Sequence, residues 1–227
     1  MCYSIESSLK TTTLSLVCII YLFLSNNPYF KWIAASLVGW CIMQFVEMLL
    51  WMTEPQHGCT KWNIIISLTL IPLAVMIQPL GVLFGSFYVT PWSKSSTLRK
   101  WFSIIFTAFA IGSVSYIHLY KPEKVCTTIT PKGHLFWAKI KENDHSDPSY
   151  FLQQGLWFLY IMLPYFVFWD KSFIFIILLT ITPLFGFLYG HFKTDSRGSI
   201  WCFYTSFASI VGAVCLFLKN QGMYNVL

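Results

Sequence analysis

Charged residues are scarce in this chain: Lys, Arg, Asp and Glu together make up 11% of its 227 residues. An average soluble domain is about a quarter charged. Because 56% of the residues are hydrophobic and the mean hydropathy is +0.61, polar residues are too few to cover a water-soluble globule. The composition excludes a soluble domain, a disordered chain and a small disulfide scaffold, and it indicates a protein embedded in a lipid bilayer.

Several patterns typical of membrane enzymes and pumps are also missing. None of the five histidines lies in the middle of a hydrophobic run, which argues against haem held by paired histidines and against desaturase histidine boxes. The last run has no lysine midway for a retinal Schiff base, and neither a Gly-x-Ser-x-Gly motif nor a pair of intramembrane aspartates indicates a protease. Without a phosphate loop or a basic stripe, we expect no cofactor and no nucleic-acid partner.

Seven hydrophobic runs account for most of the length, and they predict an all-α polytopic membrane protein, a single bundle of seven transmembrane helices over residues 1–227. A polar loop at 121–149 lies on the N-terminal side. The first run follows Lys10 like a signal peptide, but no small-residue cleavage site follows it, so we expect a retained helix. Pro72 and Pro79 predict tilt or a break in the long third run. The predicted helices are 8–25, 32–52, 63–89, 101–120, 150–169, 173–190 and 200–218.

Basic residues outside the long loop favour the C-terminal side of the membrane, six against four. By the positive-inside rule this predicts a cytoplasmic C-terminus and a lumenal or extracellular N-terminus. The six on the tail side are Lys31, Lys94, Arg99, Lys100, Lys171 and Lys219, and the four on the opposite side are Lys10, Lys61, Lys193 and Arg197.

Four cysteines map to the N-terminal side, in four different segments: Cys2, Cys59, Cys126 and Cys202. This clustering predicts two disulfides in an oxidising compartment, with three pairings open. Chance placement is the alternative. A zinc site that includes His57 and His134 is a further one, but the sequence has no tight Cys-x-x-Cys or His-x-x-x-His pair, so we expect no metal.

Polar residues inside hydrophobic runs are candidates for function because burying them costs free energy. In the second run Trp40, Gln44, Glu47 and Trp51 share one helical face. Glu47 is the only acidic residue within any run, about 7 Å below the N-terminal-side boundary. It is interpreted either as a protonatable group in a water-filled outer vestibule or as a hydrogen-bonding partner of a neighbouring helix.

The third run carries a polar stripe that begins at Asn63 and reaches Gln78, directly before Pro79. A proline there frees a carbonyl that could face an ion or a substrate. The alternative is a packing kink with Gln78 bonded to another helix. In the seventh run small residues recur at helical spacing and indicate close packing: Cys202, Ser206, Ser209 and Gly212.

Short strings along nearly the whole chain carry a resemblance: Met1-Cys2-Tyr3-Ser4, Met43-Gln44 with Glu47 and Trp51, Cys59 with Asn63, Gln78-Pro79, Cys126 with Gly133-His134-Leu135 and Trp137, and Gly198-Ser199 with Trp201-Cys202. Together they resemble an uncharacterised family of small multi-span membrane proteins of bacteria, algae and large DNA viruses, which usually has Trp where Tyr3 stands. The resemblance carries no activity over. It implies that Cys2 belongs to the mature protein, and it implies a shared N-terminal-side site of Gln44, Glu47, Asn63, His134 and Trp201.

Three functions are compatible with these patterns. The leading hypothesis is a channel or transporter-like protein for a small solute or ion, and a non-enzyme is preferred over an enzyme. The second is a membrane-embedded enzyme acting on lipid, with Glu47 and His134 as an acid–base pair under the folded long loop. The third is a non-catalytic receptor or structural protein, as in a viral envelope, without a polar cavity. The candidate binding residues are Gln44, Glu47, Trp51, Asn63, Gln78, His134 and Trp201.

Overall fold

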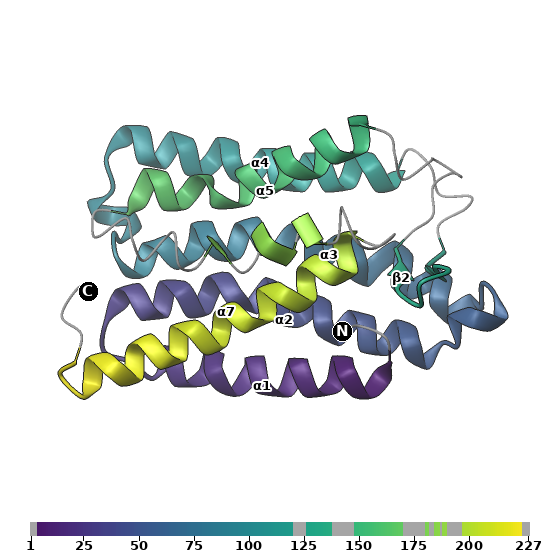
Figure 1. The fold of residues 1–227 in the computed structure, drawn as a ribbon. Helices are drawn as coiled ribbons and strands as arrows, with labels where there is room; N and C mark the ends of the chain where they lie inside the picture. Colours follow the sequence, from purple (N-terminus) through teal and green to yellow (C-terminus); the bar gives the residue numbers. More distant parts are fainter. Residues whose placement is uncertain are drawn as a thin grey trace.

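The computed structural model describes residues 4–119, 126–137, 148–169 and 197–223, with short helical pieces between 180 and 189. Within these ranges the chain is mostly helical, which confirms the predicted all-α class. Figure 1 shows the helices side by side along one common direction. They are α1 (Ile5–Phe23), α2 (Pro28–Met52), α3 (Lys61–Gly85), α4 (Thr97–Leu119), α5 (Pro148–Phe168) and α7 (Arg197–Asn220).

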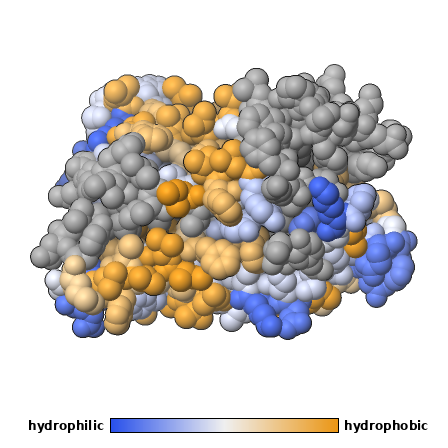
Figure 2. Space-filling model, in the orientation of Figure 1, coloured by the Kyte–Doolittle hydropathy of each residue, from blue (hydrophilic) through white to orange (hydrophobic). Residues whose placement is uncertain are grey.

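Three stretches in the described part of the chain are long and apolar enough to cross a membrane: α1, α2 and Lys61–Tyr88, which joins α3 to the short 3₁₀ helix η2 (Ser86–Tyr88). Figure 2 shows a broad hydrophobic band across the middle of one face, with hydrophilic residues mostly towards its ends. These features support a membrane protein. The count of seven spans stays a prediction.

Local sequence sets where the first three helices begin. The side chain of Ser4 accepts the Ser7 N–H, that of Asn27 accepts the Tyr29 N–H, and that of Thr60 accepts the Asn63 N–H. Each polar residue thereby satisfies a backbone donor that has no partner within its own helix. Because Asn27 is followed by Pro28, a favoured first helical residue, α2 begins at Pro28, earlier than the predicted residue 32.

Helix α2 lies at the centre of the bundle, in contact with α1, α3 and α7, while α3 also contacts α4 and α5. Pro72 and Pro79 both lie inside α3, which continues through them. Glycines bring the backbones of α2 and α3 together: a Cβ on Gly81 would lie 2.6 Å from the Ala35 carbonyl oxygen, and one on Gly39 would lie 2.7 Å from the Gln78 Cα. Small residues that permit such close approach are typical of membrane helix pairs.

At the end of the bundle where α7 ends, which we call the tail-side end, Trp32 joins three helices. Its indole N–H donates to the Val82 carbonyl at 2.6 Å, and its ring stacks on Tyr165 of α5 with ring centroids 4.9 Å apart. Trp32 is fully buried, so this hydrogen bond satisfies a donor that would be costly to leave unpaired.

A short β-hairpin lies at the opposite end of the bundle, which we call the hairpin end (Figure 1). Strand β1 (Thr128–Ile129) pairs antiparallel with β2 (Leu135–Phe136). Gly133 in the connecting turn has a φ of 79°, which favours glycine. Leu135 is fully buried in the hydrophobic core together with residues of α2. Part of the polar loop thus folds back onto the helices.

Candidate functional site

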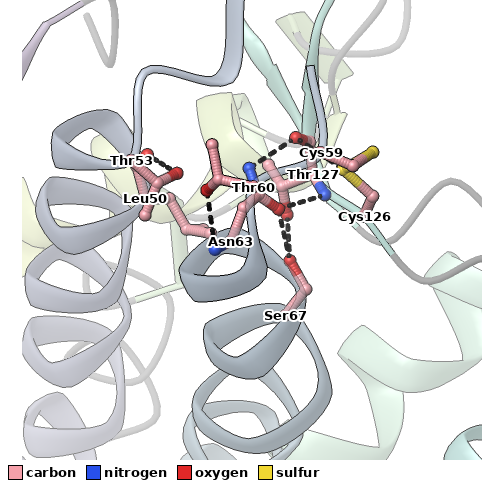
Figure 3. Close-up of a disulfide and its surroundings, with 8 residues drawn as sticks. All are labelled: Leu50, Thr53, Cys59, Thr60, Asn63, Ser67, Cys126 and Thr127. Atoms are coloured by element: carbon pink, nitrogen blue, oxygen red, sulfur yellow. Dashed lines mark hydrogen bonds between the residues drawn. A yellow bond between two sulfur atoms is a disulfide. The ribbon is translucent and has the colours of Figure 1, made fainter. Parts of the chain in front are cut away.

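A disulfide fastens the hairpin segment to the start of α3 (Figure 3). Cys59 and Cys126 are bonded across 67 sequence positions, which confirms one of the two predicted disulfides. Cys2 and the side chain of Cys202 lie outside the described residues. The three cysteines inside helices, Cys18, Cys41 and Cys215, are free thiols.

Next to the disulfide, Asn63 holds the backbone of Thr127. The Asn63 Nδ2 donates to the Thr127 carbonyl at 2.9 Å, and the Thr127 N–H donates to Asn63 Oδ1 at 2.9 Å. Ser67, one turn along α3, lies 2.8 Å from the Thr127 hydroxyl and donates to Asn63 Oδ1 at 3.2 Å. All three residues are fully buried. Asn63, predicted as a binding residue, therefore anchors the hairpin segment.

His134 sits in the turn of the hairpin and is buried, with 1% of its surface exposed. Its backbone is fixed on both sides, since its N–H donates to the Thr130 hydroxyl at 3.1 Å and its carbonyl accepts the Thr130 N–H at 2.8 Å. The predicted acid–base pair with Glu47 requires the long loop to fold over the helices. The burial of His134 shows that this part of the loop does so.

Two tryptophans at this end present buried indole donors. Trp51 lies in the last turn of α2, Trp137 follows β2, and both pack against the hydrophobic core. In the described part of the chain neither indole N–H has a hydrogen-bond partner. Buried polar atoms without a partner are rare in folded proteins. An acceptor such as a water molecule or a ligand group would satisfy them.

Glu47 of α2 is fully buried, and so is its neighbour Gln44. The Gln44 amide donates to Glu47 Oε2 at 3.2 Å, and the Thr11 hydroxyl of α1 lies 3.1 Å from Gln44 Oε1. A line of polar groups thus runs from α1 to the carboxyl. The carboxyl is enclosed in this conformation, and the hydrogen bond from Gln44 comes from its own helix.

Two predicted residues remain, Gln78 and Trp201. Gln78 is buried on α3 against Gly39, about 16 Å along the helix axis from Ser67. It lies towards the tail-side end, apart from Glu47 and His134. Trp201 belongs to the first turns of α7, and its side chain lies outside the described residues.

Residue patterns did not indicate that residues 127–130, directly after Cys126, attach the hairpin to α3. A signal was present, since Thr127, Thr128, Ile129 and Thr130 form a β-branched run directly after Cys126. Its placement on α3 could not be inferred from that run alone.

In the helices the Glu47 carboxyl, the Gln44 amide and the Thr11 hydroxyl form one polar group, and at the same end of the bundle the tethered hairpin carries the buried His134 imidazole. Among the described residues, no three or more His, Cys, Asp or Glu side chains gather as metal ligands would. The chain matches no known protein family, no curated protein and no solved structure.

Proposed function

We propose that this protein is a channel or transporter-like membrane protein that passes protons or a small cation, with Glu47 as the group that binds them. The observation that supports this function best is the complete burial of a carboxyl group on the central membrane helix. Such groups are expensive to bury and are typically retained for ion or proton movement.

Whether Glu47 carries a charge depends on what surrounds its carboxyl. A carboxylate away from water is stable only with a proton, a cation or several hydrogen bonds. Gln44 donates one hydrogen bond to Glu47 Oε2. Because release of a proton or cation leaves a buried negative charge, we expect release to be coupled to a conformational change that admits water.

The enclosed position of Glu47 corresponds to a closed state. The hairpin is fixed to α3 by a disulfide and by the Asn63 amide, while α1 contacts Gln44 through the Thr11 hydroxyl. We expect opening to move α1 relative to α2 and to leave the hairpin on α3.

We place the hairpin end on the lumenal or extracellular side, because disulfides form in oxidising compartments and the basic residues favour a cytoplasmic tail.

The test uses purified protein in liposomes with an internal pH-sensitive dye and a proton or potassium gradient. We expect Glu47→Gln to lower the flux at least tenfold, which corresponds to about 1.4 kcal/mol or more, and to abolish its pH dependence. The matched control is Glu54→Gln, an exposed carboxyl at the same end. Unchanged flux in Glu47→Gln, or no flux through the wild-type protein, would contradict the proposal.

A lipid-acting enzyme is the second candidate, and one observation favours it: the hairpin folds onto the bundle and buries His134 at the same end as Glu47. In that function the imidazole and the carboxyl act as acid and base on a lipid ester. The same liposomes distinguish the two functions. Lipid breakdown that His134→Gln and Glu47→Gln both abolish, without ion flux in the wild type, would favour the enzyme.

A further inference from the structure

Three basic residues gather at the tail-side end of the bundle, between the end of α3 and the first turn of α4. Lys94 lies in the 3₁₀ helix η3 (Trp92–Lys94), and Arg99 and Lys100 lie at the start of α4. We call these three residues the basic patch. Lys94 is exposed, while Arg99 and Lys100 are half-buried.

Aromatic rings hold two of these cations in place. The Arg99 guanidinium lies 5.3 Å from the centroid of the Phe168 ring, and the Lys100 ammonium lies 6.0 Å from that of Trp92. Phe87 contacts both rings, at 5.6 Å from Trp92 and 6.2 Å from Phe168. Cation–π contacts of this kind fix a charge without neutralising it.

No acidic residue in the described part of the chain compensates the basic patch. The described acidic residues are Glu6, Glu47 and Glu54, and all three belong to the hairpin end. None of the three basic residues forms an ion pair with a described residue. Adjacent like charges repel, so an anionic partner would stabilise this end of the protein.

An apolar stripe continues directly from the basic patch along the outside of α4. Its members recur at three- and four-residue spacing and are among the most exposed apolar side chains described: Leu98 (80%), Trp101 (60%), Ile105 (64%) and Phe109 (57%). This spacing places them on one face of the helix. The face is largely exposed, although Phe109 at its far end also contacts Tyr160 of α5, with ring centroids 5.0 Å apart.

We propose that the basic patch and the α4 stripe together bind an anionic phospholipid, with its phosphate at Arg99 and Lys100 and its acyl chains along the stripe. The charge complements a phosphate, and only a lipid combines that phosphate with apolar chains that would cover a helix face running into the membrane. A free phosphate would leave the stripe unused. The surface lies at the opposite end from Glu47, and the inference does not depend on the proposed transport.

The experiment measures the association of spin-labelled phosphatidylglycerol and spin-labelled phosphatidylcholine with the full-length protein, reconstituted in equimolar phosphatidylcholine and phosphatidylglycerol. We expect a preference for phosphatidylglycerol that decreases with added salt. In Arg99→Gln/Lys100→Gln we expect that preference to fall about fivefold for each cation removed. Arg99→Lys/Lys100→Arg keeps both charges and should retain most of the preference.

Lys10→Gln/Lys61→Gln is the matched control, since it removes two exposed cations from the hairpin end. It should leave the phosphatidylglycerol preference unchanged. Thermal unfolding in phosphatidylcholine alone shows whether each variant is folded. Equal association of the two lipids with the wild-type protein would overturn the proposal, and so would a preference that a folded Arg99→Gln/Lys100→Gln variant retains or that the control variant loses equally.

Discussion

Asn63 and Thr127 lie 64 positions apart, yet the side-chain amide of Asn63 pairs with both backbone groups of Thr127. Donor and acceptor are matched as they are between neighbouring β-strands. The Asn63 side chain thus allows an extended segment to attach to the first turn of α3 without leaving buried backbone groups unpaired.

The Asn63 pairing predicts that Asn63→Ala destabilises the protein. Two buried backbone groups of Thr127 would lose their partner, at a cost of roughly 2–4 kcal/mol. Thermal unfolding in detergent should show a clearly lower midpoint. Thr69→Ala is the matched control, since the Thr69 hydroxyl is exposed and donates to the Ile65 carbonyl of its own helix. An equal effect of both substitutions would rule out a special role for Asn63.

The disulfide predicts that the hairpin depends on oxidation. By the chain-entropy estimate a bridge across this separation contributes about 4 kcal/mol, an upper bound here because embedded helices already restrict the unfolded chain. In Cys59→Ser/Cys126→Ser we expect faster amide hydrogen exchange over residues 126–137 than in the wild type. Cys215→Ser, which removes a free thiol, should leave that exchange unchanged. Unaltered exchange in the double variant would mean that hydrogen bonds alone hold the hairpin.

Replacing glycine by alanine should lower the stability of the protein at one position and raise it at another. Gly81→Ala places a methyl group against the Ala35 carbonyl, so we expect a loss of about 1–3 kcal/mol from forced separation of α2 and α3. In Gly112→Ala the new Cβ meets nothing within 4 Å, so we expect a gain of up to about 1 kcal/mol from helix propensity. Thermal midpoints that shift in the same direction would contradict the packing argument.

The proposed orientation predicts which end a membrane-impermeant maleimide reaches in intact cells or sealed vesicles. A single cysteine introduced at the hairpin end by Gln56→Cys should be labelled from the lumenal or extracellular side, because Gln56 is exposed. One introduced at the tail-side end by Gln221→Cys should be labelled only after permeabilisation. The reverse pattern would invert the orientation.

The membrane class and the approximate positions of the first three helices could be predicted because long hydrophobic runs are local signals. The capping residue Asn27, which sets the start of α2, is a local signal too, but the prediction did not use it. The polar residues of α2 were also found from local periodicity, since Gln44 and Glu47 share a face and are hydrogen-bonded. The pairing of Cys59 with Cys126 could not be selected among three connectivities, because it depends on how α3 and the long loop meet in space.

Other features depend on contacts between distant segments. Asn63 and Gln78 belong to one predicted stripe, but Asn63 binds the hairpin segment while Gln78 packs against Gly39. The sequence also presents Glu47 as a group close to the surface, whereas the folded chain encloses it. A hydropathy pattern records which residues avoid water, and it does not record what covers them.

The Cys59–Cys126 bond also constrains the order in which the protein is made. Cys126 follows α3 and α4 in the chain, so a ribosome must complete both helices before the bond can form. The bond is therefore a late event for the N-terminal half, which is synthesised well before the hairpin is in place. During biogenesis the buried polar side chains of Asn63 and Ser67, which bond Thr127 in the folded protein, must be satisfied by other groups, such as water, lipid headgroups or the insertion machinery.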